Sequence, residues 1–271
     1  MIRVSVLSEN TSLDERFYAE HGLSLFIENG EEKVLFDMGA SRGFLANATT
    51  LNIDIASANY AVVSHGHSDH GGGLEAFLDA NSNAKVYIHI DAFGNYYSKR
   101  ADGKMHYIGL DRALENSTRL VKVDRDISVS HSSDIMTNIL RKYSLPMADG
   151  NLYSDEVPDD FSHEIDFVTR GDNGYVLFVG CAHMGIRNIL EHFYAKYGTM
   201  PIAVVGGFHL SSRSHRCESD SAIDSLGEYL LGTGATFYTC HCTGERGYNR
   251  LSNIMGDRVH YVRAGSVIDI N

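Results

Sequence analysis

The sequence lacks several features that would place it in other classes of protein. Only three of its 271 residues are proline, which argues for a compact globule without a long disordered linker. No apolar run approaches the roughly 20 residues that a membrane-spanning helix needs. The segment Met1–Leu7 (MIRVSVL) has the pattern of a strand rather than of a secretory signal peptide. We therefore expect a cytoplasmic protein without a membrane partner.

Cysteine and positive charge are also scarce. The four cysteines, at positions 181, 217, 240 and 242, form no convincing disulfide framework. Cys240 and Cys242 flank His241 on a predicted strand, so we expect both to be small buried thiols that point away from it. A redox or metal-binding role is the alternative for this pair. The formal net charge is −12 and no Lys/Arg run stands out, which disfavours a nucleic-acid partner. A small-molecule substrate is expected, and a homo-oligomer is left open.

One segment is rich in metal-binding side chains. Residues 63–74 (VSHGHSDHGGGL) place His65, His67, Asp69 and His70 within six positions. Imidazole and carboxylate groups are ligands that Zn²⁺ and similar divalent ions prefer, so four of them in one loop can hold most of a two-metal site. The alternative is a solvated, histidine-rich turn, which would not need ligands interleaved with glycines.

The local pattern explains this spacing. The apolar run 60–64 predicts a buried strand that ends where the histidines begin. Alternate residues leaving a strand point the same way, so His65 and His67 can converge on one ion, while Asp69 and His70 fall in the following turn. Gly66 and residues 71–73, all glycine, are expected to permit a tight backbone path. A short amphipathic helix is predicted over 74–80.

Strands and helices alternate along most of the chain. This alternation predicts an α/β protein in which mixed β-sheets pack together with helices outside. The predicted strands are 2–8, 23–28, 33–37, 60–64, 85–90, 175–179, 202–205, 236–239 and 259–262, and the predicted helices are 41–52, 74–80, 185–197, 219–231 and 244–255.

The segment from about 93 to 160 is less periodic than the rest. Short strand-like pieces occur around 119–123 and 126–130, and aromatic and basic side chains are frequent. We interpret this segment as an insertion that forms a lid over the site. Within it, the side chains expected to select the substrate are Tyr96, Arg100, Lys104 and His106.

Three further histidines lie where a predicted strand runs into a loop. They are His183 in the segment GCAHMG, His209 in GGFHL and His241 in CHCTG. Loops at the carboxyl ends of strands collect functional groups in α/β sheets. A single such histidine is more often structural, but three of them in a chain that already carries four ligand residues point to one shared metal site.

These segments together resemble the metallo-β-lactamase fold superfamily. The resemblance rests on H-x-H-x-D-H after a buried strand, on the strand-end histidines, and on an opening hairpin with the element Asp37-Met-Gly39. It implies an αβ/βα four-layer sandwich over residues 1–271, with one or two metal ions between the sheets. The segments GCAH, GGFHL and CHCTG more narrowly resemble a branch of metal-dependent hydrolases. Some members of that branch are named as dihydropterin-methyl-ribofuranosylaminobenzene-phosphate synthases.

The resemblance also implies roles for individual residues. A first metal would be held by His65, His67 and His183, and a second by Asp69, His70 and His241. Asp37 resembles the family's buried carboxylate, which orients a ligand imidazole by binding the ring nitrogen that does not face the metal. The alternative interpretation is that Asp37 is only a turn residue before Gly39. His163, in the polar segment DDFSHE, is a rival of His183 for the first metal.

One departure from the family pattern affects the metal centre. Many relatives carry a bridging aspartate after the strand that corresponds to 175–179, where this chain has Gly180 and Cys181. Cys181 either binds metal as a thiolate or only packs, which leaves open whether one or two ions bind. Zn²⁺ is the expected ion, with Mn²⁺ or Fe²⁺ as alternatives. The choice among them depends on Cys181, since a thiolate ligand would favour the softer ion.

The leading hypothesis for function is metal-dependent hydrolysis of a small phosphorylated or ester substrate. A metal-activated hydroxide would attack, and Asp69 would orient it. The resemblance to the nuclease branch of the superfamily implies that His209 acts as general acid or binds a phosphate oxygen. The first alternative is a synthase that joins a pterin to an aminobenzene ribosyl phosphate. The second is a sensor that binds metal and ligand without turnover.

Overall fold

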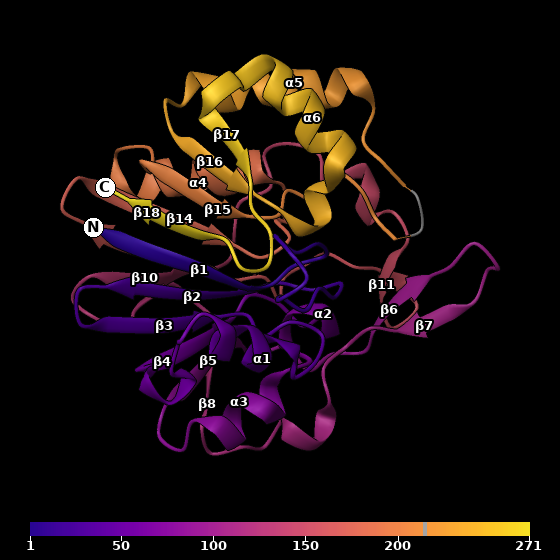
Figure 1. The fold of residues 1–271 in the computed structure, drawn as a ribbon. Coiled ribbons are helices and arrows are strands. Elements are labelled where there is room, and N and C mark those ends of the chain that lie inside the picture. Colours follow the sequence, from indigo (N-terminus) through magenta and orange to yellow (C-terminus); the bar gives the residue numbers. More distant parts are fainter. Residues whose placement is uncertain (214–215) are drawn as a thin grey trace.

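The central strands of this protein, such as Tyr60–Val63 and Ala203–Gly206, are apolar and buried on both faces, so each main sheet needs cover on two sides. The computed structural model, which describes residues 1–213 and 216–271, provides that cover in four layers (Figure 1). Two mixed sheets pack face to face in the middle, and helices cover the outer face of each. The predicted sandwich is therefore confirmed.

The first sheet combines an antiparallel half with a parallel half. Its strands, in spatial order, are β18 (Val267–Ile270), β1 (Ile2–Ser8), β2 (Ser24–Asn29), β3 (Glu32–Phe36), β4 (Tyr60–Val63), β5 (Lys85–His89) and β8 (Leu120–Val123). From β3 to β8 the neighbouring strands are parallel, so β3 and β4 end at the same edge of the sheet.

The second sheet has the same mixed character. Its order is β17 (Val259–Tyr261), β16 (Thr236–Thr239), β15 (Ala203–Gly206), β14 (Gly174–Val179), β13 (Asp166–Gly171), β10 (Ser133–Met136) and β9 (Ile127–Ser128). The strands β14 to β17 are parallel to one another, and their carboxyl ends meet at one edge.

Three groups of buried side chains hold the layers together. The inward residues of both sheets, such as Phe36 and Phe178, form the central core. Phe44 and Phe77 fill the space between the first sheet and its helices, while Phe193 lies in the core beneath the helices of the second sheet.

Within the described part of the chain, six α-helices and five 3-10 turns connect the strands. The helices are α1 (Gly43–Thr50), α2 (Ser68–Gly71), α3 (Leu74–Ala80), α4 (Ile186–Tyr197), α5 (Asp220–Gly232) and α6 (Gly244–Met255). The 3-10 turns are η1 (Ile55–Ser57), η2 (Arg112–Leu114), η3 (Met147–Asp149), η4 (His241–Thr243) and η5 (Gly256–Arg258).

The segment predicted as a lid insertion is divided among three sheets. It supplies β8 to the first main sheet and β9 and β10 to the second. Its remaining strands form a small separate sheet that extends from one side of the molecule (Figure 1). That sheet has the order β12 (Val157–Pro158), β11 (Leu152–Ser154), β6 (Tyr96–Lys99) and β7 (Met105–Tyr107). The part outside the sandwich is therefore smaller than the interval 93–160.

The predicted elements match most of the observed ones closely. Strand β1 and helices α3 and α6 have the predicted bounds. Strands β10, β13 and β18 are absent from the predicted elements, because polar residues interrupt their apolar pattern, as in DFVTRG for β13. Among the described residues, no helix is both long enough and apolar enough to span a bilayer.

Candidate metal centre and active site

The strand-end residues singled out in the sequence meet at one edge of the sandwich. His65 follows β4 in the first sheet, while His209 and His241 follow β15 and β16 in the second. Cys181 and His183 follow β14. The two sheets face each other, so their carboxyl-end loops close over a common pocket.

The first cluster consists of His65, His67 and His183. Their ring nitrogens that could bind a metal all lie within 4.8 Å of one another. The Nε2 atom of each is buried and has no hydrogen-bond partner. Three unpartnered buried nitrogens aimed at one point are costly unless a cation joins them.

Hydrogen bonds on the far side of two rings fix which nitrogen faces this point. The Ser64 hydroxyl donates to Asp37, so it accepts from Nδ1 of His65 at 2.9 Å. Nδ1 of His183 donates to Oδ1 of Asp149 at 2.6 Å. With Nδ1 protonated in both rings, each Nε2 presents a lone pair, as a metal ligand requires.

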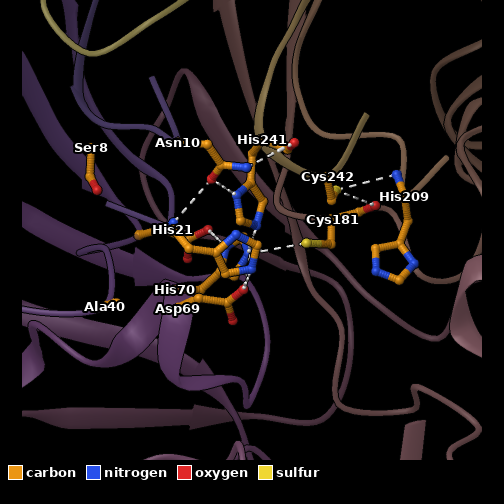
Figure 2. A network of polar contacts seen from close by, with 12 residues as sticks. Ser8, Asn10, His21, Ala40, Asp69, His70, Cys181, His209, His241 and Cys242 are labelled. Atoms are coloured by element: carbon orange, nitrogen blue, oxygen red, sulfur yellow. Dashed lines mark hydrogen bonds and ion pairs between the residues drawn. The ribbon is translucent and has the colours of Figure 1, made fainter. Parts of the chain in front are cut away.

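The second cluster is formed by Asp69, His70 and His241, with Cys181 beside them (Figure 2). Nε2 of His70 lies 3.2 Å from Nε2 of His241 and 3.1 Å from the sulfur of Cys181. Oδ2 of Asp69 lies 3.5 Å from Nε2 of His241. The structure thus brings together the three residues that the resemblance assigns to a second metal.

Buried acceptors orient the two histidines of the second cluster. Nδ1 of His70 lies 2.6 Å from Oδ2 of Asp37, and both side chains are inaccessible to solvent. Asp37 also accepts from the Ser64 amide at 2.7 Å, so it has a structural task as well. Nδ1 of His241 donates to Oδ1 of Asn10 at 2.8 Å. Both arrangements leave Nε2 directed at the cluster.

Cys181 occupies the middle of the whole site. Its sulfur lies within 4.8 Å of metal-binding atoms in each of three sets, which are His65 with His70, His183 with His209, and His241 with Cys242. Both options for Cys181, a metal-binding thiolate and a packed thiol, are consistent with this central position.

The prediction that Cys242 points away from the site is wrong. Strand β16 ends at Thr239, and residues 241–243 form the 3-10 turn η4, which lacks the alternation of a strand. The Cys242 sulfur therefore comes within 4.8 Å of metal-binding atoms of Cys181 and His241, and it accepts the His209 amide at 3.3 Å. Cys240 is buried in the core between the sheets, as predicted.

His209 shares a carboxylate with a residue of the first cluster. Its Nδ1 lies 2.7 Å from Oδ1 of Asp149, the same oxygen that accepts from His183. Burial alone would lower the pKa of His209, but the charge of Asp149 outweighs it and raises this pKa to about 9. At neutral pH the imidazole is therefore protonated and can give up a proton.

The other buried imidazoles have pKa values set by the same two effects. Burial, with neighbouring imidazoles adding to it, holds the pKa values of His65 and His67 well below the usual range. Burial also lowers the pKa of His183 to about 4, against the opposing charge of Asp149. For His70, Asp37 outweighs burial and raises the pKa to about 9. The first cluster is thus neutral at pH 7 and free to bind a cation.

Several residues of the loops that carry the site have strained backbone conformations. Asp37, Ala182, His209 and His241 all have positive φ angles, between 44° and 57°, although none is glycine. Such conformations cost on the order of 1–3 kcal/mol each and persist where the surroundings impose them. Buried carboxylates supply part of that constraint. Glu164 accepts the amides of His183 and Met184 at 2.7 and 2.8 Å.

The glycines of the metal-binding loop permit a tight backbone path, as predicted, because a Cβ at each would clash with its neighbours. None of Gly66 and residues 71–73 has a positive φ angle, so conformational freedom is not what they provide. At Gly73 a Cβ would collide with the carbonyl oxygen of Met38 and lie 2.8 Å from the carbonyl oxygen of Ser41. Glycine is therefore needed because the backbones approach so closely.

A cavity of about 300 Å³ opens beside both clusters. Four of the predicted metal ligands line it, namely His67, Asp69, His183 and His241, whereas His65 and His70 lie behind the wall. The small sheet and its surroundings contribute Ser98, Arg100, Tyr107, Asn151 and Leu152. Of the side chains predicted to select substrate, Arg100 lines this cavity. Tyr96 is buried behind His67 with its hydroxyl donating to the Asp91 carbonyl, and Lys104 and His106 are exposed elsewhere on the β6–β7 hairpin.

His163 lies next to the first cluster but has no free nitrogen. Its Nδ1 accepts the amide of Gly66 at 3.0 Å, and its Nε2 lies 3.2 Å from Asp159. The structure therefore gives His183, and not His163, the free nitrogen in the cluster. His163 instead supports the loop between His65 and His67.

Several residues near the clusters have no signal in the sequence. Asp149, Glu164 and Glu9, which accepts the His241 amide at 2.8 Å, come from irregular segments or a strand end, where no periodicity marks them. His21, whose Nε2 lies 3.1 Å from Oδ2 of Asp69, stands alone in the loop before β2. A single residue of this kind is recognised only once the fold brings it to the site.

The architecture and the histidine-rich clusters agree with comparisons to known proteins. The model of the metallo-beta-lactamase superfamily matches residues 18–241. The chain belongs to that superfamily. Membership supports a metal-dependent hydrolase at the level of the family, with histidine, cysteine and aspartate clusters able to bind metal.

Individual known proteins are similar over nearly the full length of the chain. An uncharacterized protein of Methanocaldococcus jannaschii is 30% identical, covering 98% of this chain and 100% of its own. From the same organism, 7,8-dihydropterin-6-methyl-4-(beta-D-ribofuranosyl)-aminobenzene-5'-phosphate synthase is 23% identical over 98% of this chain and 96% of its own. The crystal structure of a metal-dependent hydrolase of the beta-lactamase superfamily superposes with a TM-score of 0.83 at 29% identity, covering 100% and 99% of the two chains.

Proposed function

We propose that this protein is a metal-dependent hydrolase of a small phosphorylated or ester substrate. The observation that carries the proposal is the convergence of three buried, unpartnered Nε2 atoms, those of His65, His67 and His183, beside a cavity large enough for a small molecule. The donor set fits Zn²⁺ or a similar divalent ion. A second ion would be held by Asp69, His70 and His241, with Cys181 between the two.

The chemistry that divalent ions supply in such a site is polarisation of the scissile group and a hydroxide nucleophile at neutral pH. Asp69 borders the cavity with a half-buried carboxylate, where it can accept a hydrogen bond from the attacking water and orient it. The imidazoles of the first cluster stay neutral near pH 7, so no proton competes with the metal for their Nε2 atoms.

His209 is placed to assist the leaving group. It lines the cavity on the side of the first cluster, and Asp149 keeps its ring protonated. A protonated imidazole can donate to a departing oxygen or hold a phosphate oxygen. Arg100 at the wall of the cavity adds a permanent positive charge that suits an anionic substrate.

The test combines metal analysis with turnover of bis-p-nitrophenyl phosphate and p-nitrophenyl esters. His67→Ala and Asp69→Ala should lose metal-dependent turnover, while His131→Ala, in an exposed loop, should retain it. Full activity in either site variant contradicts a hydrolase that works through these clusters. Circular dichroism of each variant establishes that the loss is not a failure to fold.

A second candidate function has one observation in its favour. The similarity to the pterin–aminobenzene ribosyl phosphate synthase extends over nearly the whole chain. In a synthase the same ions would bind phosphate and stabilise charge rather than activate water. Incubation with a dihydropterin diphosphate and the aminobenzene ribosyl phosphate distinguishes the two. A joined product supports the synthase, and hydrolysis alone supports the hydrolase.

A further inference from the structure

His21 lies directly against the second cluster. Its Nε2 atom is 3.1 Å from Oδ2 of Asp69, and its ring centroid is 4.7 Å from that of His241 (Figure 2). The potential ligand atoms of these three residues all lie within 4.8 Å of one another. His21 also lines the cavity, so the three atoms converge on its wall.

The backbone fixes His21 in this place. The amide of Leu23 donates to the carbonyl of Asp69 at 3.1 Å, and the amide of Gly22 donates to Oδ1 of Asn10 at 3.4 Å. A Cβ at Gly22 would lie 2.5 Å from the Asp69 carbonyl oxygen, so this loop and the metal-binding loop are in contact. Asn10 is also the acceptor that orients His241. One side chain therefore ties His241 to the loop that carries His21.

The hydrogen-bond chemistry of the group leaves a place for a cation. An amide oxygen cannot donate, so Nδ1 of His241 carries the proton of its bond to Asn10, and its Nε2 faces Oδ2 of Asp69 as a second acceptor at 3.5 Å. Two acceptors face each other favourably when a cation lies between them. His21 directs a further nitrogen at the same carboxylate oxygen. Among the described residues, the side chain of His21 forms its ion pair with Asp69 and stacks at a tilt against the ring of His241.

We propose that His21 is a ligand of the second divalent ion, together with Asp69 and His241. The inference rests on the proposed function only in requiring that a metal binds. It adds an imidazole from the loop between β1 and β2 to a site whose predicted ligands, Asp69, His70 and His241, come from two other loops. With Cys181 on the opposite side, the second ion would have nitrogen, oxygen and sulfur donors within reach.

The test is a titration of the metal-free protein with Zn²⁺ against a chromophoric chelator. Wild type should bind two ions per chain. His21→Ala should retain the first ion and bind the second at least about tenfold more weakly, as expected for loss of a group that ligates or orients at a metal site. His21→Gln should show the same weakening, because a side-chain amide can donate to Asp69 but is a poor zinc ligand.

Two control variants make each outcome decisive. His131→Ala removes an exposed histidine and should leave both affinities unchanged, while Asp69→Ala should lose the second ion. Unchanged second-ion affinity in His21→Ala, or affinity restored by glutamine, overturns the inference and leaves His21 as a partner that orients Asp69. If wild type binds no ion at all, the proposed function fails as well. One bound ion in wild type, unaffected by His21→Ala, overturns this inference alone.

Discussion

Oδ1 of Asp149 lies 2.6 Å from Nδ1 of His183, and both side chains are buried. This contact fixes the tautomer of a first-cluster histidine from a segment far away in the sequence. The same oxygen also holds His209, so one carboxylate links the predicted metal ligand with the predicted proton donor.

Replacing Asp149 with asparagine should weaken the first metal site. The amide can present a donor where His183 requires an acceptor, which disturbs the tautomer that directs Nε2 at the ion. We expect zinc affinity about 10–100-fold lower, measured by chelator competition. Asp102→Asn, on the exposed turn of the β6–β7 hairpin, is the matched control. Equal affinities in the two variants would show that Asp149 does not orient the ligand.

The same substitution should change how the stability of the metal-free protein depends on pH. Asp149 raises the pKa of His209 from 6.5 to about 9, so its stabilisation is complete below pH 6.5 and is lost as the pH rises through 9. The difference in melting temperature between wild type and Asp149→Asn should therefore shrink between pH 6 and pH 10. A difference that stays constant or grows over this range contradicts the interaction.

The fold and the core of the site could be predicted because their signals are local. The ligand spacing of residues 65–70 follows one buried strand, and His183, His209 and His241 each follow another, so strand periodicity locates them. Asp149 and His21 lie in irregular segments that only tertiary packing brings to the site. The predicted direction of the Cys242 side chain is wrong because the strand ends before this residue, which lies in a 3-10 turn. Local pattern therefore predicts positions along strands better than orientations within loops.

Cys181 should give the metal centre a spectroscopic signature. If its thiolate binds the ion, Co²⁺-substituted protein should show a sulfur-to-cobalt charge-transfer band in the near ultraviolet. Cys181→Ser should lose most of this band, and Cys217→Ser, which alters an exposed cysteine, should keep it. Absence of the band from wild type, with cobalt bound, would show that Cys181 only packs.

Arg100 should select for charge in the substrate. Arg100 lines the cavity, while Lys104 on the same hairpin does not. Comparing alanine variants at the two positions therefore distinguishes direct contact with the substrate from a general effect of positive charge. Arg100→Ala should raise KM for a phosphorylated substrate about tenfold or more, since a hydrogen bond to a charged group contributes about 1.5–3 kcal/mol. KM for a neutral ester should change little in either variant. Equal effects of Arg100→Ala and Lys104→Ala on the phosphorylated substrate would contradict this role.

The most direct test of the central claim is the metal content of purified protein, measured by elemental analysis together with anomalous X-ray scattering. The structure predicts a divalent transition metal bound by Nε2 of His65, His67 and His183, a second ion near Asp69, His70 and His241, and loss of the first ion in His67→Ala but not in His131→Ala. A folded wild-type protein that holds no transition metal, even after incubation with zinc, would contradict the account.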